Sequence, residues 1–184
     1  MKRCCVNNTI DIMKFLIESG LNIDIPCCGD PYYHIINYVC YAGTCEMVKL
    51  FLDNGINVDC VSENLLSMLV NGPAKEEYDF IVAGGVTDIP QNFYNYQNSI
   101  FQIQFEKIKL LIDYGLNIQK QNILGLVGAI KKANYETVEL LVNNGADINC
   151  AIEMINKSPP NKTIDFFVNL GFDPVILATL WFPK

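Results

Sequence analysis

The sequence has a single histidine, a single tryptophan and few charges, with only 18% of its 184 residues charged. His34 is therefore the only imidazole base, and no serine or cysteine lies in a nucleophile-elbow motif. A phosphate-binding loop is also lacking, since Gly84-Gly85 is not part of a GxxxxGKS motif. We expect a protein that is not an enzyme, with no catalytic residues and no cofactor.

Positive charge is scarce. The chain has 13 Lys and Arg against 20 Asp and Glu, a net charge of −7, and Lys131-Lys132 as the basic pair within its repeats. Nucleic-acid binding needs clustered basic side chains, so it is disfavoured. No apolar stretch follows Met1 as a signal peptide would require, and residues 175–182 are shorter than the ~20 that cross a membrane. We expect a soluble, intracellular protein without nucleic-acid or membrane partners.

The eight cysteines contain no CxxC motif, so a zinc site would need four scattered thiolates. Cys60 and Cys150 each stand five residues after a glycine, and Cys40 falls on the apolar side of a predicted helix. Free cysteine behaves as a small buried hydrophobe. We expect reduced, structural thiols and no metal, with Cys27-Cys28 as the one candidate for an exposed, oxidisable pair.

Six helical apolar runs each end in glycine and are followed by a short aliphatic-polar tail. The tails read GLNID, GINVD, GGVTDI, GLNIQ, GADIN and GFDPV, from Gly20, Gly55, Gly84, Gly115, Gly145 and Gly171. With Gly85 as the third anchor, the spacings are 35, 30, 30, 30 and 26 residues. A period of this length indicates a solenoid, in which each unit packs on its neighbours.

The run before each glycine has one broad apolar stripe. Apolar residues stand three, four, five and seven positions before the glycine, which predicts a helix buried on two sides. The outward positions carry acids and lysines: Asp11, Glu46, Glu76, Glu106 and Glu136, and Lys14, Lys49 and Lys109. A shorter helix precedes each such helix; the candidates are His34–Ala42, Asn64–Asn71, Tyr94–Gln102 and Leu124–Lys132, with turns at Gly43, Gly72-Pro73, Ile103 and Ala133. Residues 1–8 fit the same slot, and residues 151–156 form a shortened version.

The second helices of TCEMVKLFLDNGINVD and NYETVELLVNNGADIN resemble those of the ankyrin-repeat family almost residue for residue. The family's Thr-Pro-Leu-His signature is absent from the first helices, and the 30-residue step is shorter than the usual 33. This shortened period and the Asn-, Ile- and Tyr-rich composition are similar to the ankyrin proteins of large amoeba-infecting DNA viruses. The resemblance implies a protein-binding module, in the host cytoplasm if the chain is viral.

We therefore predict an all-α ankyrin-type solenoid of about six repeats, with short or absent β-hairpin fingers and a helical C-terminal cap. The expected single domain spans residues 1–184, with repeats at 1–24, 25–59, 60–89, 90–119, 120–149 and 150–175 and a cap at 176–184.

Because the β-hairpin fingers are expected to be short or absent, we expect the binding surface to be the exposed, concave face of the first helices. Steps of 30 along that face give Tyr41, Asn71, Phe101 and Lys131, and the neighbouring row gives Asn37, Ser67, Gln97 and Val127. Tyr94 widens the patch, and Tyr32-Tyr33 lie in the one loop long enough to extend. Tyrosines packed on their own helix are the alternative. The expected partner is a host or viral protein of unknown identity.

Two other functions remain open at this point. The chain would act as a structural component if it associates with itself through its repeat ends, although a capped C-terminus favours a monomer. An adaptor to a host ubiquitin ligase is known among viral ankyrin proteins, but ILATLWFPK is too short to be the F-box-like tail that such adaptors carry.

Overall fold

The computed structural model describes residues 9–24, 34–71, 93–155 and 161–181, except for the side chains of 93–101, 161, 162 and 180. These ranges form ten α-helices and two 3₁₀-helices and contain no β-strand, in agreement with the all-α prediction. The helices are α2 (Ile10–Glu18), α3 (Ile35–Ala42), α4 (Cys45–Asp53), α5 (Leu65–Asn71), α7 (Phe93–Asp113), α8 (Leu124–Lys131), α9 (Tyr135–Asn143), α10 (Ile148–Glu153), α11 (Asn161–Asn169) and α12 (Pro174–Trp181), with η1 (Val58–Cys60) and η2 (Ile118–Lys120).

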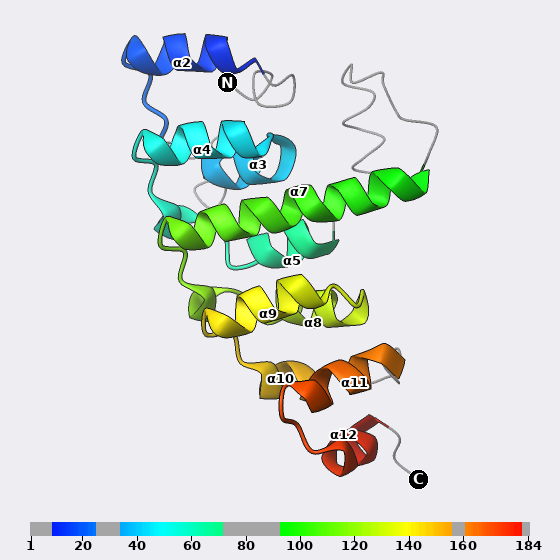
Figure 1. The fold of residues 1–184 in the computed structure, drawn as a ribbon. Coiled ribbons are helices and arrows are strands. Elements are labelled where there is room, and N and C mark those ends of the chain that lie inside the picture. The colour runs from blue at the N-terminus through cyan, green and yellow to red at the C-terminus, as the bar shows by residue number, and fades with distance from the viewer. Residues whose placement is uncertain (1–8, 25–33, 72–92, 156–160, 182–184) are drawn as a thin grey trace.

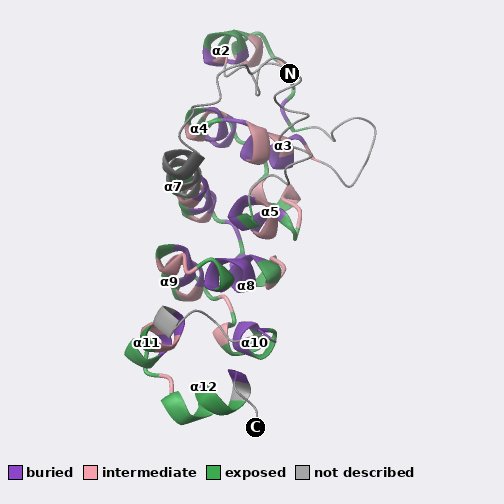
Figure 2. Ribbon diagram, turned by 90° about the vertical axis from the view of Figure 1, so that its right-hand side faces the viewer, coloured by how far each residue is buried: buried purple, intermediate pink, exposed green. Residues whose placement is uncertain are grey.

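The helices stack in two columns (Figure 1). In Figure 2 one column holds α3, α5, α8 and α10, and the other holds α2, α4, α7, α9 and α11. Buried residues face inward between the columns, and α12 lies beneath the last pair. We call the first set the first-helix column and the second set the second-helix column.

The predicted apolar stripe of the second helices is largely buried. Its most buried positions stand four and seven residues before the glycine, and include Met13, Val48, Phe51, Ile108, Leu111, Val138, Leu141 and Phe167. The stripe narrows at the N-terminal end of the array, where Phe15 is 67% exposed. Burial on two sides therefore does not extend to every position of the pattern.

Each described tail repeats one backbone design. Gly20, Gly55, Gly115, Gly145 and Gly171 all have φ between 80° and 97°. The next residue's N–H donates to the carbonyl five residues back, which is the C-terminal motif that glycine permits. Two residues after each glycine, an Asn or Asp side chain accepts a hydrogen bond from the backbone N–H two positions on, at 2.7–3.0 Å. This bond forms a turn directly after the glycine, so the described tails continue without a β-hairpin.

The predicted C-terminal cap helix is confirmed as α12. Its Trp181 is buried, and its ring lies 5.6 Å from that of Phe167 in α11. The indole Nε1–H donates to the carbonyl oxygen of Ile152 in α10 at 3.4 Å. Trp181 thus ties the cap to both columns.

One prediction about the helices is wrong: there is no turn at Ile103, because α7 runs unbroken through that position. Its N-terminal part extends beyond the two columns (Figure 1). Helix α7 packs against both α4 and α5, and α5 packs extensively against α8. Among the described helices, α7 is therefore the member of the second-helix column that packs beside α5. The second helix that the sequence predicts directly after α5 falls in residues 72–92, outside the described residues.

Two polar contacts support the same arrangement of the helices. The Asn122 N–H donates to the Glu63 carbonyl at 2.6 Å, and the Lys120 ammonium lies 3.3 Å from the Asp59 carboxylate. These pairs link the segment that begins with η1 to the segment that begins with η2. The two segments follow Gly55 and Gly115, which are 60 residues apart in the sequence. The tail of Gly84-Gly85, which stands between them in the sequence, falls outside the described residues.

Candidate binding surface

Three of the predicted binding residues lie at matching places in the first-helix column. Tyr41, Asn71 and Lys131 occupy the C-terminal ends of α3, α5 and α8. Asn71 and Lys131 are exposed, and Tyr41 is half-buried. The Asn71 amide donates to the Ser67 hydroxyl at 3.1 Å, which fixes its orientation. We call these three residues the first-helix row.

Phe101 does not belong to this row. It lies in α7, which is part of the second-helix column, because the turn expected at Ile103 is absent. Tyr94 is in the same helix, and the side chains of both residues lie outside the described part of the structure. Tyr32 and Tyr33 also lie outside the described residues, so their predicted roles stay predictions.

The neighbouring row, expected to face solvent, is mostly core. Asn37 and Val127 are buried, Ser67 is half-buried, and the side chain of Gln97 lies outside the described part of the structure. The Asn37 side-chain oxygen accepts a hydrogen bond from the Ser62 N–H at 2.8 Å, so its role is to satisfy a loop amide. Direct packing of one first helix on the next covers this row.

Two lysines close the C-terminal ends of first helices. The ammonium of Lys107, a buried residue, donates to the Cys40 carbonyl at 2.9 Å. The ammonium of Lys132, an exposed residue, donates to the Val70 and Asn71 carbonyls at 3.0 and 2.8 Å. Burial lowers the pKa of both groups. Cations stabilise the negative end of a helix dipole. Both Lys131 and Lys132 are exposed, but the Lys132 ammonium is engaged by these two carbonyls, whereas Lys131 lies at the end of α8 in the first-helix row.

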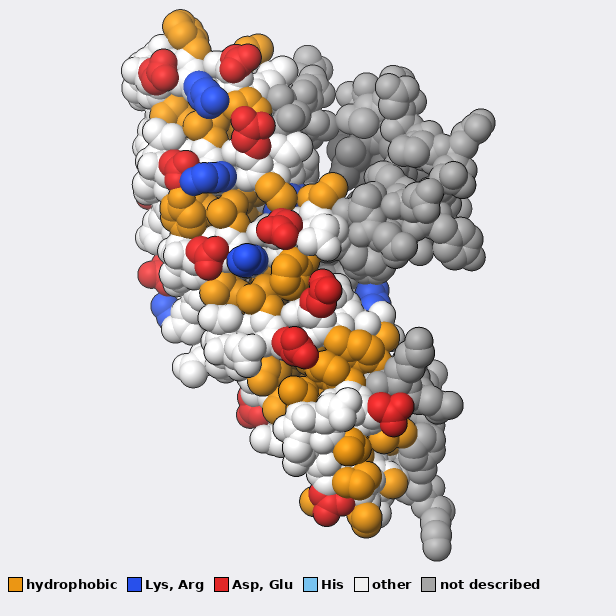
Figure 3. All heavy atoms as spheres, viewed as in Figure 1, with side chains coloured by type: hydrophobic (Ala, Val, Ile, Leu, Met, Phe, Trp, Pro, Cys, Tyr) orange, Lys and Arg blue, Asp and Glu red, His pale blue; other side chains and the backbone are white. Residues whose placement is uncertain are grey.

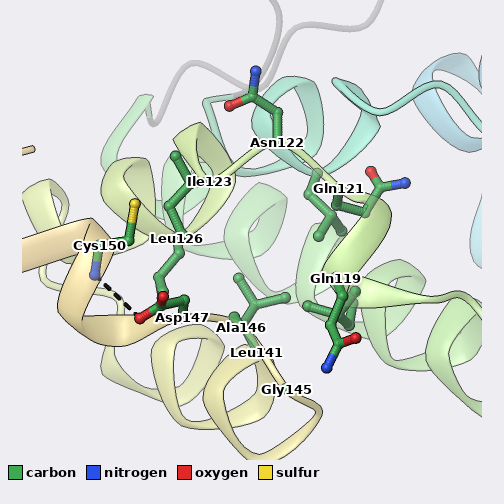
Figure 4. A pocket seen from close by; sticks show the side chains of 12 residues that line it. Gln119, Gln121, Asn122, Ile123, Leu126, Leu141, Gly145, Ala146, Asp147 and Cys150 are labelled. Carbon is green, nitrogen blue, oxygen red and sulfur yellow. Dashed lines mark hydrogen bonds between the residues drawn. The ribbon is translucent and has the colours of Figure 1, made fainter.

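A pocket of about 250 Å³ opens where two tails meet, and the sequence analysis did not predict it. Figure 4 shows it between η2, the start of α8 and the tail that joins α9 to α10. Its apolar lining comprises Leu66, Ile118, Ile123, Leu126, Leu141 and Ala146, and its polar lining comprises Gln119, Gln121, Asn122, Asp147 and Cys150. We call it the tail pocket.

The polar groups of the tail pocket are partly engaged. The Asp147 carboxylate accepts hydrogen bonds from the Asn149 and Cys150 N–H groups at 3.0 and 3.1 Å (Figure 4). Cys150 is exposed, which corrects the expectation that it is a buried structural thiol. Cys40, by contrast, is fully buried, as predicted, and burial raises the pKa of its thiol to about 12. The pocket can hold an apolar side chain, with amide groups at its edge to bind a peptide backbone.

The structure also brings together three metal-binding residue types that the sequence analysis treated as dispersed. One ligand atom each from Asp24, His34 and Cys60 lies within 4.8 Å of the others. The His34 Nε2 is 3.0 Å from the Asp24 Oδ1. Asp24 and Cys60 stand four and five residues after Gly20 and Gly55, in successive tails. These are not equivalent positions of the repeat, so the cluster arises from the way the successive tails pack and not from a sequence motif.

The second-helix column presents a different surface. Figure 3 shows acidic side chains along it, with lysines and apolar patches between them. The predicted outward residues Glu46, Glu106 and Lys109 are exposed, and the Lys49 ammonium lies 3.0 Å from the Asp53 carboxylate. Among the described helices, none combines the length and apolar character needed to cross a membrane.

The described fold is all-helical and compatible with a helical repeat protein. A stretch of 41 residues, 22% of the chain, is 42% identical to a protein of Acanthamoeba polyphaga mimivirus that is named as an ankyrin repeat protein. The stretch covers 14% of that protein, so this chain matches a small part of its relative. No protein-family model matches the chain, and no solved structure matches it.

Proposed function

We propose that this chain is an ankyrin-type solenoid that binds another protein without catalysis. The observation that carries the proposal is the stack of helix pairs joined by tails of one design. Such arrays expose a long surface while each unit packs only on its neighbours, which suits them to binding. The similarity to a viral ankyrin repeat protein supports the same function. The expected setting is intracellular and soluble, and the partner is a host or viral protein.

The proposed binding surface is the first-helix row together with the tail pocket. Helix α8 contributes to both, since Lys131 is at its C-terminal end and Leu126 lines the pocket. An aromatic ring, an amide and a cation in one row offer varied contacts, as interfaces require. Tyr32, Tyr33, Tyr94 and Phe101 remain proposed contributors. The net charge of −7 favours protein over nucleic acid as the partner.

The test compares variants against whichever partner co-purifies from expressing or infected cells. Tyr41→Ala/Lys131→Ala removes two contacts of the row, and Ile123→Asp puts a charge at the tail pocket. Loss of hot-spot contacts of more than ~2 kcal/mol would weaken binding at least tenfold. Glu46→Ala/Glu106→Ala is the matched control, because both glutamates are exposed on the second-helix column. Stronger loss in the control pair would place the binding surface on that column instead.

Self-association through the ends is the second candidate function. Val175 and Ile176 of α12 are 67% and 57% exposed, and Phe15 and Ile12 of α2 are 67% and 52% exposed. Exposed apolar groups of this kind favour contact with another surface. Light scattering across a concentration series tests this function. Growth in mass that Val175→Glu/Ile176→Glu abolishes would support it, and a constant monomer mass would rule it out.

A further inference from the structure

Three segments of chain converge on one point beside the first-helix column. Asp24 ends the tail after α2, His34 is the residue that caps the N-terminus of α3, and Cys60 ends η1. The tails bring Asp24 and Cys60 to the imidazole, and the three ligand atoms lie within 4.8 Å of one another. His34 and Cys60 are half-buried, and Asp24 is exposed.

We propose that Asp24, His34 and Cys60 bind a single divalent transition-metal cation of the zinc class. An oxygen, a nitrogen and a sulfur ligand suit Zn²⁺, whose bonds to these atoms are ~2.0–2.3 Å. Ca²⁺ and Mg²⁺ prefer all-oxygen sites, so the donor set argues against them. Three protein ligands leave a fourth position for water or an external group.

The geometry needs only a small adjustment to close on a metal. Tetrahedral bonds of ~2.0–2.3 Å place ligand atoms roughly 3.3–3.8 Å apart, while the widest pair here is within 4.8 Å. The Asp24 side chain is 49% exposed, and its Oδ1 is already 3.0 Å from the His34 Nε2. The ligands come from three separate segments in the N-terminal part of the array rather than from one peptide.

Metal binding would change the protonation of His34 and Cys60. The His34 Nδ1 accepts the Ile36 N–H at 3.5 Å, a long contact, and Nε2 carries its proton toward Asp24. A metal on Nε2 moves that proton to Nδ1, at the expense of the weak cap, and displaces the proton of the Cys60 thiol. One proton is released for each metal bound. No oxidation or reduction occurs.

The electrostatic surroundings favour a cation. The Asp24 carboxylate lies within 4.8 Å of the Cys60 thiol, and a second carboxylate, that of Asp59, belongs to the preceding residue of η1. A divalent cation offsets those charges and stabilises the thiolate. Asp59 is itself paired with Lys120 at 3.3 Å, so it does not compete as a ligand. The bound metal would link the α2 tail, α3 and η1 and so stabilise the N-terminal part of the array.

The experiment titrates Co²⁺, and separately Zn²⁺, into the untagged full chain after removal of metal with chelator. We expect one equivalent to bind, with a cobalt–thiolate absorption band, release of one proton and a higher melting temperature. Cys60→Ser should remove the band, and Asp24→Asn should weaken binding at least tenfold. Both changes are at positions that are not fully buried, and circular dichroism of each variant checks that it is folded.

Two matched controls locate the site. Cys150→Ser alters the equivalent position of a later tail and should leave cobalt binding unchanged. Cys27→Ser/Cys28→Ser removes the vicinal pair and should retain the band. A band that persists in Cys60→Ser, or that disappears only in the Cys27/Cys28 variant, would overturn the proposal. These readouts are independent of partner binding, so the proposed function stands or falls separately.

Discussion

Gly125 of α8 lies so close to Leu66 of α5 that a Cβ at position 125 would come within 2.8 Å of the Leu66 Cβ. One turn further on, a Cβ at Gly128 would come within 2.9 Å of the Asn71 side chain. The two glycines leave part of the α8 surface without side chains, and α5 packs against that part. The sequence therefore specifies contact between these helices, although they are separated by the whole of residues 72–123.

Gly125→Ala should destabilise the protein by about 1–3 kcal/mol, the usual cost of overpacking. The added methyl group would also meet the backbone of Leu66 and Ser67, at 3.2 Å, which cannot move as a flexible side chain can. Urea unfolding followed by circular dichroism measures the change. Lys131→Ala, in the same helix but exposed, is the control. Equal stability of wild type and Gly125→Ala would contradict the close packing of α5 on α8.

Leu111→Ala and Leu141→Ala should each lower the free energy of unfolding by ~2–5 kcal/mol, because both side chains are fully buried. Glu106→Ala should change it by only a few tenths of a kcal/mol, since exposed charges contribute little. The same urea titration compares the three variants. A loss in Glu106→Ala as large as in the leucine variants would mean that the buried face of α7 is assigned wrongly.

Gly55→Ala should cost ~1–2 kcal/mol for conformational reasons alone. Its φ is +80°, and no atom lies within 4 Å of a Cβ built there, so a methyl group would be strained but not crowded. Gly55→Asn should cost less, because asparagine adopts the left-handed conformation more readily. Thermal melts of the pair check the order. The prediction fails if Ala is tolerated better than Asn.

Stability should fall as pH rises above about 9, through the Cys40 thiol. Burial raises its pKa from 9.0 to about 12, so it stays protonated in the folded chain while the unfolded chain ionises. Below about pH 9 both states hold the proton and the effect vanishes. At about pH 10 the linkage is on the order of 1 kcal/mol. Denaturant titrations at pH 7 and 10 should show this extra loss in wild type and not in Cys40→Ala, which serves as the reference for the other titrating groups.

The second helices and their glycine endings were predictable because each is encoded within about 15 consecutive residues. The apolar stripe, the outward acids and the glycine all act locally, and the positive φ of Gly115 follows from its place at a helix end. Helix α12 was predictable for the same reason.

The pairing of α5 with α7 was not predictable from spacing. Gly55 and Gly115 stand two 30-residue periods apart, so the count cannot tell which helix lies beside α5. The packing of α7 against α5 is a contact between segments far apart in the sequence, and only the structure shows it. The cluster at His34 was missed for a similar reason, since its members come from three separate segments. The tail pocket likewise depends on how two tails meet.

Trp181 gives the protein a built-in optical probe of one end. It is the only tryptophan in the chain, and it is buried at the last step of the array against Phe167. Its emission therefore reports the environment of the final layer alone, whereas circular dichroism averages over all the helices. A difference between the two signals during heating would reveal fraying from the C-terminal end, and coincident signals would show that the array melts as one cooperative block.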